Sequence, residues 1–406
     1  MKTNAVTLRP TTREDYPKVQ VLLAEVGWPV RSQEGWDWAF ENNPDRVALE
    51  CELGVPVASG WVLESDEGIH GYLGNLPQSF SIDNTRVVGA TCTSYLVQKK
   101  WRAHSVKLMR AFFTQPGVQM VYSTTANANS VPLYKLYKAE TLADPKVTQS
   151  LLWVASDRSF IEFALRRKGL TAFLPFGKLL APVLHSLRTL VGYASLPALA
   201  FGGTIRQLQA SDVGDAFDDL WQTVKEQPGL WLARNKELVQ WRYSNPDTLE
   251  DMVLLGAFER EILVGYLIAK ADRKPNDKVS RVYLLDMVVN PNASQNVAPC
   301  LMHKLCGWAK AQDLPWVEAP RFGGTLGEQL RNCQPHVRQL ALTSHYLRVF
   351  DKAVQEKLQN GPAWPCSAVD GDAWLGMTDH TVRSNRIQWK ATTSNLAPTH
   401  IGNQIK

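Results

Sequence analysis

Two stretches of this sequence decide the fold: VQKKWRAHSVKLMRAFFTQ at residues 97–115 and NANSVPLYKLYKA at residues 127–139. A strand-like run rich in Thr and Val, residues 89–97, leads into the first stretch, which ends in a helix with apolar residues every three or four positions. The apolar run VQMVYSTTA, residues 118–126, predicts another strand before the second stretch. The order strand, loop, helix, strand, helix predicts an α/β domain with a mixed sheet.

The pattern that precedes these stretches occurs twice, about 200 residues apart. VTLRPTTREDYPKVQVLL at residues 6–23 and GTIRQLQASDVGDAFDDLW at residues 203–221 both predict a short strand followed by a capped helix. Each is followed by a Trp-containing segment that ends in Asn-Pro, at 43–44 and 245–246. An offset of this size indicates two copies of one domain.

After each Asn-Pro the sequence predicts two strands joined by a tight turn, at Gly54-Val55 in the first copy and at 259–261 in the second. A polar stretch without periodicity ends the chain and is expected to be disordered. The expected division of the chain is 1–160 and 203–376 for the two domains, 161–202 for the linker and 377–406 for the polar tail.

The two stretches resemble the GNAT superfamily of acyl-CoA-dependent N-acyltransferases. The acyl-CoA loop of that family reads V-x-P-x-[YF]-R-G-x-G-[IV]-[GA], and Trp101-Arg102 stands at its Tyr-Arg position. The second motif reads N-x-x-A-x-x-L-Y-x-x-x-G-F, and Asn127 and Leu133-Tyr134 match it in register. The resemblance implies two tandem GNAT-like domains joined by a helical linker. It also implies direct acyl transfer from acetyl-CoA to an amine or hydroxyl of a small-molecule acceptor.

The resemblance implies three groups of cofactor-binding residues. Backbone at the end of the long strand would hold pantetheine, and Asn127 would orient pantetheine or cap the last helix. The start of the following helix would meet the diphosphate, because a helix N-terminus leaves about four N–H groups unpaired and carries partial positive charge. The expected cofactor-binding residues are Tyr95, Leu96, Val97, Arg102, Ala103, His104, Ser105, Val106, Lys107 and Asn127.

Tyr134 stands where the family places the tyrosine that protonates the departing thiolate, so we expect it to be catalytic. The alternative is a core aromatic residue on an amphipathic helix. Ser105 and Lys107 stand where the family has small residues. A second interpretation is therefore a catalytically inactive GNAT-fold binding or scaffold protein at a membrane surface.

The general base is not singled out by any pattern, although Asp286 between apolar neighbours on a strand is the most suggestive carboxylate. Cys92 lacks a recognisable Cys-His-Asn arrangement, so a nucleophilic role is not expected. Cys300, His303 and Cys306 lack the paired spacing of structural zinc sites, so no metal is expected.

The second copy has an Asn-rich loop without a cation at 290–298, which favours a structural role or the acceptor side of the site. The final segment WPCSAVDGDAWLG, residues 364–376, is expected to be a strand that docks on the second copy. It resembles bacterial GNAT proteins associated with exopolysaccharide and cell-surface glycans, so an amino sugar is a candidate acceptor. The tryptophans expected to rim a cleft for such a sugar are Trp28, Trp36, Trp38, Trp101 and Trp231.

Composition limits the class of protein. The 406 residues are 45% hydrophobic with 14 Trp, which excludes a disordered chain, and a net charge of +5 does not indicate nucleic-acid binding. Scattered cysteines and an N-terminus without an apolar segment predict a cytoplasmic protein with reduced thiols.

Residues 163–211 contain six Lys or Arg and no Asp or Glu, with apolar runs too short to span a bilayer. Two interpretations stay open: helices of a linker packed on both domains, or peripheral contact with the inner membrane.

Overall fold

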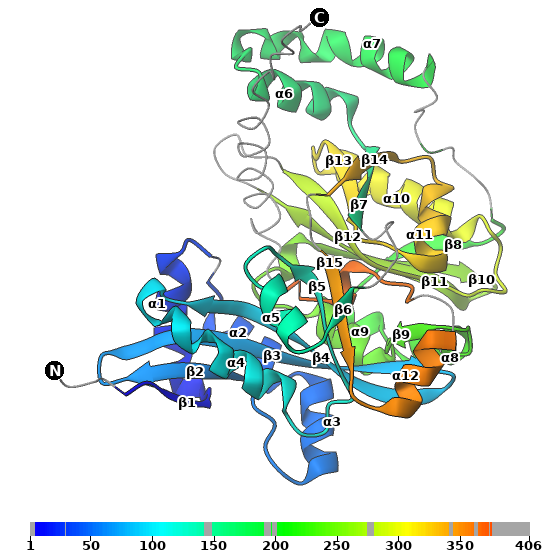
Figure 1. The fold of residues 1–406 in the computed structure, drawn as a ribbon. Coiled ribbons are helices and arrows are strands. Elements are labelled where there is room, and N and C mark those ends of the chain that lie inside the picture. Colours follow the sequence, from blue (N-terminus) through cyan, green and yellow to red (C-terminus); the bar gives the residue numbers. More distant parts are fainter. Residues whose placement is uncertain are drawn as a thin grey trace, which may run out of the picture.

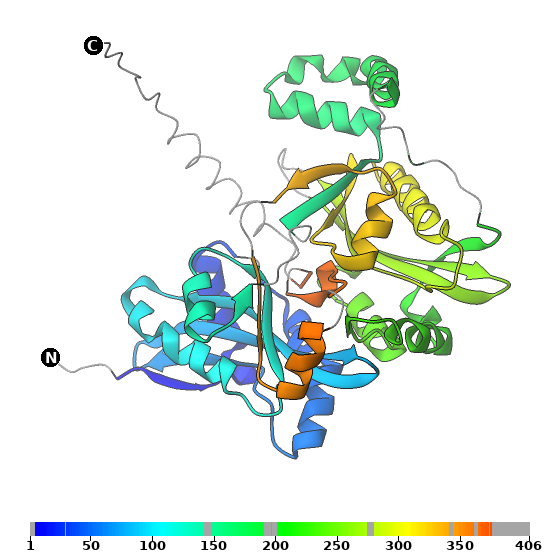
Figure 2. The ribbon, with the colours of Figure 1, turned by 45° about the vertical axis from the view of Figure 1, so that its right-hand side comes forward.

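The computed structural model describes residues 5–28, 30–141, 148–190, 196, 201–273, 280–340, 344–360, 364–372 and 374–375. Within these residues the chain forms two mixed β-sheets, each accompanied by helices (Figures 1 and 2). The predicted fold class is confirmed. The tail predicted at 377–406 lies outside the described residues.

The first sheet contains eight strands, of which β4 and β5 form the parallel pair. Its order is β1 (Thr7–Pro10), β2 (Gly60–Ser65), β3 (Gly68–Ile82), β4 (Thr85–Val97), β5 (Met120–Ala126), β15 (Ser344–Val349) and β6 (Glu140–Thr141), with β9 (Leu230–Leu232) paired to β3. The second sheet has an equivalent order, in which β12 and β13 are parallel. It runs β8 (Thr204–Leu208), β10 (Met252–Glu259), β11 (Ile262–Asp272), β12 (Arg281–Val289), β13 (Trp316–Pro320), β7 (Gln149–Val154) and β14 (His336–Gln339).

The two sheets exchange one strand each. The strand after β5 in the first sheet is β15, from near the C-terminus, and the strand after β13 in the second is β7, from the first 160 residues. The expected boundaries at 1–160 and 203–376 stay a prediction, but sheet membership crosses them. We call residues before 157 the first half and residues after 203 the second half.

Helices complete each half. In the first half they are α1 (Tyr16–Glu25), α2 (Gln33–Trp36), α3 (Pro44–Leu53), α4 (Ser105–Phe113) and α5 (Val131–Leu136). In the second half they are α8 (Asp215–Lys225), α9 (Lys236–Tyr243), α10 (Val297–Ala311), α11 (Gly324–Arg331) and α12 (Lys352–Asn360). Between the halves, α6 (Asp157–Arg167) and α7 (Gly177–Leu190) form a hairpin that projects away from the sheets (Figure 1).

The strand predicted directly after Asn43 is wrong, because residues 44–53 form helix α3. The Asn43 side chain accepts the Asp45 N–H at 3.0 Å and Pro44 occupies the first helical position. Gly54 ends the helix in the left-handed conformation, with φ at +65°. These start and stop signals are typical of a helix and outweigh the apolar pattern between them.

Because helix α3 takes the place of the first predicted strand, the hairpin turn of the first half does not lie where the sequence predicted it. In the first half, β2 and β3 turn at residues 66–67 rather than at Gly54. In the second half the expected turn is confirmed, since Arg260 and Glu261 both have positive φ, 48° and 66°, and join β10 to β11.

A reciprocal contact between Trp38 and Trp241 joins the halves. Their rings stack with centroids 5.1 Å apart. Each indole N–H donates to the other residue's backbone carbonyl, at 2.8 and 2.9 Å. Trp374 packs edge-on against both rings, at 5.4 and 5.5 Å. One hydrophobic cluster around this contact contains buried residues from both halves.

This contact corrects the expectation of a Trp-rimmed sugar cleft. Trp36, Trp38 and Trp101 are buried in the core, and Trp101 stacks on His70 with centroids 4.4 Å apart. Their faces are therefore covered by protein and cannot stack on a sugar. Trp28 and Trp231 are half-buried.

The C-terminal segment, residues 364–375, is not the strand that the sequence predicted; its described part holds only one short 3₁₀ turn. It lies between the two sheets and contacts both (Figure 1). Trp364 packs edge-on against Tyr122 of β5, with centroids 5.2 Å apart. On the opposite side, the Gly323 N–H donates to the Cys366 carbonyl at 3.1 Å.

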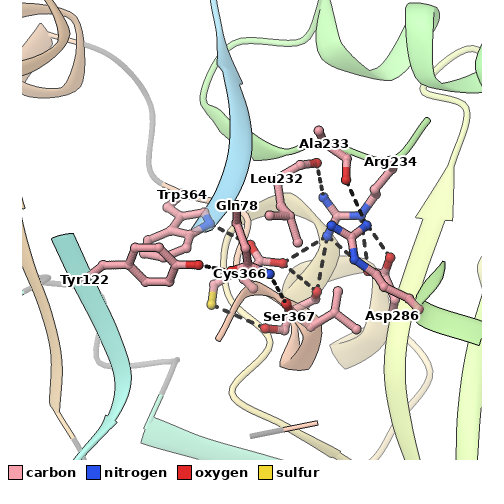
Figure 3. Close-up of polar contacts among 12 residues, drawn as sticks. Gln78, Tyr122, Leu232, Ala233, Arg234, Asp286, Trp364, Cys366 and Ser367 are labelled. Atoms are coloured by element: carbon pink, nitrogen blue, oxygen red, sulfur yellow. Dashed lines mark hydrogen bonds and ion pairs between the residues drawn. The ribbon is translucent and has the colours of Figure 1, made fainter. Parts of the chain in front are cut away.

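Arg234 joins this segment to the second sheet (Figure 3). Its guanidinium, 1% exposed, lies 2.9 Å from Asp286 on β12 and 3.0 Å from Asp370. The Trp364 indole N–H and the Ser367 hydroxyl also donate to Asp370, at 2.6 and 2.7 Å. The Asp286 carboxylate is thus occupied by a buried ion pair, which argues against the base role considered for it.

Replacing Arg234 with Met tests this cluster. The substitution removes the cation that pairs directly with buried Asp286 and Asp370, so we expect the free energy of unfolding to fall by about 3–5 kcal/mol. Urea unfolding of the full chain, followed by tryptophan fluorescence, measures the change. The control Arg206→Met removes an exposed pair with Glu261 and should leave the transition unchanged. An equally small effect of Arg234→Met would contradict this account of the cluster.

Candidate functional site

The parallel strands β4 and β5 separate part-way along their length. They are paired over three positions, the last of which is Thr91 opposite Tyr122. Beyond Thr91, β4 continues to Val97 and pairs only with β3. Ser94, with φ at +55°, marks a β-bulge in this free part of β4. The separation leaves a gap, the β4–β5 gap, with one strand on each side.

Peptide groups at the end of β4 are directed into this gap. The Gln98 N–H donates to the His70 carbonyl at 2.8 Å. Because antiparallel pairing alternates between bonded and unbonded positions, the N–H and C=O of Val97 point away from β3, toward the gap. Leu96 lies opposite Tyr72 within the ladder. Of the predicted strand residues, Val97 therefore offers free backbone groups.

A 3₁₀ helix, Lys99–His104, joins the end of β4 to helix α4, so the predicted loop is helical. Tyr95 ties the two together, since its hydroxyl donates to the Ser105 carbonyl at 3.3 Å. The Lys107 ammonium donates to the Val6 carbonyl at 3.0 Å, so the long side chain is engaged beside β1. Val106 at the first turn is exposed.

The remaining predicted loop residues lie beside this helix start. Arg102 and Ala103 are exposed, while His104 is half-buried next to Trp101. The Arg102 carbonyl accepts the Ser105 N–H, while the Arg102 side chain forms no hydrogen bond or ion pair with any described residue. The predicted loop therefore presents a short 3₁₀ helix with exposed cations, Lys99 and Arg102, which offer positive charge to a phosphate.

The second half lacks an accessible helix start. There β12 and β13 are paired only as far as Tyr283 opposite Glu318 and then separate in the same way. However, the first turn of α10 is buried, with Val297 and Ala298 both in the core. Among the described residues, only the first half thus combines a strand gap with an exposed helix start.

Tyr134 places its hydroxyl where β4 and β5 separate. The oxygen lies 3.1 Å from the sulfur of Cys92 on β4, and Ser123 on β5 also hydrogen-bonds to it. Cys92 and Ser123 are the first residues after the last paired position. The ring is 1% exposed and stacks on Tyr346 of β15. Burial and then the neighbouring Cys92 raise the pKa of Tyr134 well above its ordinary value, so the phenol is protonated at neutral pH.

The side chain of Asn127 accepts hydrogen bonds from its own loop. Its side-chain oxygen accepts the N–H groups of Asn129 and Ser130, at 2.9 and 3.3 Å. These bonds close a turn before α5, whose N-cap residue is Ser130 rather than Asn127. Its predicted role in orienting pantetheine stays a prediction.

Sequence reasoning missed Asp372. Its carboxylate accepts the Thr125 hydroxyl at 2.7 Å, just beyond the gap. Its charge adds to the rise in the pKa of Cys92 and Tyr134, which burial mainly causes. The residue is half-buried with an enclosed carboxyl, and burial raises the pKa of that carboxyl. The Asp-Gly-Asp turn was visible in the sequence but gave no spatial position.

Basic side chains from both halves surround Asp372. Arg321, after β13, and Arg31 both act to lower the pKa of its carboxyl. His345 on β15 is 1% exposed, and neither ring nitrogen has a hydrogen-bond partner among the described residues. Burial and then the charge of Arg321 lower the pKa of His345 to about 3. A buried imidazole without a partner marks a place where a bound group or water completes the contacts.

Within the described residues, no cluster of three or more His, Cys, Asp or Glu side chains is arranged to hold a metal ion. His303, considered above with two cysteines, instead hydrogen-bonds through Nδ1 to the Leu196 carbonyl at 2.9 Å.

Comparison with solved structures identifies the architecture. A GCN5-related N-acetyltransferase from Kribbella flavida matches with a TM-score of 0.52 at 14% identity, over 86% of this chain and 72% of that one. The N-myristoyltransferase of Saccharomyces cerevisiae, solved with bound myristoyl-CoA and inhibitors, matches with a TM-score of 0.53 at 14% identity. That match covers 90% of this chain and 82% of the yeast chain. The chain has the GNAT fold.

These similarities concern the fold alone, because the sequences are so far apart. No protein-family model and no curated protein matches this sequence. The resemblance to the GNAT superfamily is confirmed at the level of fold. The equivalent strand orders are what two tandem copies would give, but the duplication and the link to exopolysaccharides stay predictions.

Alkylation tests the environment of Cys92. Burial raises the pKa of its thiol to about 12, so little thiolate exists at pH 8.5. We expect iodoacetamide to modify Cys92 at least ~100-fold more slowly than the exposed Cys51, as measured by peptide mass mapping of the native protein. Because the folded pKa is raised above 9.0, this thiol stabilises the fold below about pH 9 and loses that effect toward pH 12. Equal rates for the two cysteines would contradict the enclosed Cys92–Tyr134 contact.

Proposed function

We propose that the protein is an acyl-CoA-dependent acyltransferase whose first half binds the acyl-CoA. The observation that carries the proposal is the Tyr134 hydroxyl at the β4–β5 gap, in contact with Cys92 on the strand that leads toward α4. The GNAT fold supports this class of donor, since one structural neighbour was solved with myristoyl-CoA.

The residues present fit acyl-CoA. The diphosphate would lie beside the 3₁₀ helix Lys99–His104 that leads into α4, where the exposed side chain of Arg102 favours an anion. The pantetheine amides would pair with the gap-facing N–H and C=O of Val97. A ligand held at these two points would bring its thioester to Tyr134.

Acyl-CoA supplies an acyl group activated as a thioester. Asp372 would accept the proton of the acceptor's amine or hydroxyl as that group bonds to the thioester carbon, because a carboxylate with a raised pKa is a stronger base. Tyr134 would give its proton to the sulfur as the carbon–sulfur bond breaks. Tyr134 then regains a proton from solvent and Asp372 releases one, so the products are the acylated acceptor and the free thiol of CoA.

The acceptor would approach between the halves, where Arg31 of the first half and Arg321 of the second act on Asp372. Two cations beside the proposed base favour an acceptor that carries a negative charge or several oxygens. Acetyl-CoA is the proposed donor, and an amino sugar or another cell-surface-glycan precursor is the proposed acceptor.

Calorimetric titration of the full chain with acetyl-CoA, CoA and myristoyl-CoA tests the donor. We expect micromolar binding that Arg102→Ala weakens roughly tenfold, since a charge-assisted contact with the diphosphate is lost. Arg110→Ala, an exposed cation in the last turn of the same helix, is the matched control and should bind like wild type. Absence of binding at millimolar ligand would refute the proposal and favour the scaffold interpretation.

Two substitutions separate catalysis from binding. Tyr134→Phe and Asp372→Asn should each lower kcat by about 10²–10⁴-fold while the affinity for CoA changes little. The rate of wild type should rise with pH through the raised pKa of Asp372, and Asp372→Asn should remove that rise. Thiol release with a panel of amino sugars, followed from pH 4 to 9, measures both. If both variants keep the wild-type rate and pH profile, these roles are wrong.

A further inference from the structure

The α6–α7 hairpin projects from the edge of the second sheet, directly after β7 (Figures 1 and 2). Its inner helix rests on the body, because Phe160 and Phe163 of α6 meet the Trp316 ring edge-on at 6.0 and 5.0 Å. The outer helix rests on the inner one. Gly177 of α7 is buried against Glu162 of α6, where a Cβ would lie 3.2 Å from the Glu162 side chain.

The outer surface of the hairpin is apolar, and large side chains on it are left exposed by the described residues. Six large side chains between the end of α6 and the middle of α7 are 42–71% exposed. They are Leu170, Phe173, Phe176, Leu179, Leu180 and Val183. Folded soluble proteins rarely leave so many neighbouring large apolar groups in water unless the surface binds something.

Cations border these apolar groups and acids are absent. Arg166, Arg167 and Lys168 at the end of α6 are exposed, next to Leu170. From residue 163 to residue 211 the sequence contains no Asp or Glu. We call residues 166–183 the hairpin surface. It combines exposed aromatic and aliphatic side chains with positive charge only.

We propose that the hairpin surface binds the surface of an anionic lipid bilayer. Phe and Leu side chains would enter the boundary between headgroups and acyl chains, while Arg and Lys pair with lipid phosphates. No helix in the described parts of the chain is long and apolar enough to cross a membrane, so the hairpin would lie in the plane of the surface.

Charge favours anionic lipid over two other possible occupants of the hairpin surface, namely the last residues of the chain and a second copy of the chain. The last 31 residues carry one acid, Asp379, and four cations, so they are a poor partner for a positive surface. A second copy of the chain would bring the same cations against each other. Anionic lipid is both apolar and negative and therefore matches both features. Lipid binding does not require acyl transfer, so the two proposals can fail separately.

Vesicle flotation of the full chain tests the proposal. We expect the protein to float with vesicles of phosphatidylcholine mixed with phosphatidylglycerol and to remain at the bottom with phosphatidylcholine alone. Two double variants, Phe173→Ser with Phe176→Ser and Arg167→Glu with Lys168→Glu, should each weaken binding at least tenfold, since each phosphate-paired cation contributes about 1 kcal/mol. Ile262→Ser, at an equally exposed apolar residue on β11, is the matched control and should bind like wild type.

Circular dichroism establishes that each variant is folded before its binding is compared. Flotation with neutral vesicles equal to that with anionic vesicles would overturn the proposal, as would wild-type binding by both double variants. Sedimentation velocity tests whether a second copy of the chain binds the hairpin surface instead. A dimer that the Phe173→Ser with Phe176→Ser variant dissociates, without vesicle binding by wild type, would assign the hairpin surface to self-association instead.

Discussion

The reciprocal contact of Trp38 with Trp241 fixes how the two halves face each other. Each indole N–H is satisfied by the other residue's carbonyl, so both buried donors are paired only when the two segments meet in this one arrangement. Trp374 packs on both rings and anchors the C-terminal segment at the same point. Because β7 and β15 also cross between the sheets, each sheet is incomplete without the other half.

That anchoring determines which charges reach the two strand gaps. Asp372 precedes Trp374 by two residues and is therefore held beside Tyr134 at the β4–β5 gap. In the second half, Asp286 lies on β12 beyond its last pair with β13, and Arg234 neutralises it. The β4–β5 gap thus has Asp372, a carboxyl with a raised pKa, together with the protonated phenol of Tyr134. In the second half, the Asp286 carboxylate is neutralised by a structural ion pair. The same architecture gives the halves different chemistry.

The sequence predicted what local patterns control. Periodicity located β4, α4, β5 and α5, whereas the loop expected before α4 is a 3₁₀ helix over Lys99–His104. Helix α3 was missed because its caps, Asn43 and Gly54, were read as strand boundaries. The exchange of β7 and β15, and the approach of Asp372, depend on contacts across more than 160 residues of chain, which no local pattern carries. The sequence predicted that the tryptophans rim a sugar-binding cleft, because composition does not distinguish a buried aromatic ring from an exposed one.

Hydrogen–deuterium exchange of the full chain, with and without CoA, tests the central claim most directly, namely that the first half holds the donor at the β4–β5 gap. The account predicts slower exchange in peptides spanning residues 95–108, where Val97 and the 3₁₀ helix before α4 would receive the ligand. Peptides spanning 290–300, at the equivalent helix start of the second half, should be unchanged. Protection confined to the second of these regions would contradict the account and move the donor site to the other half.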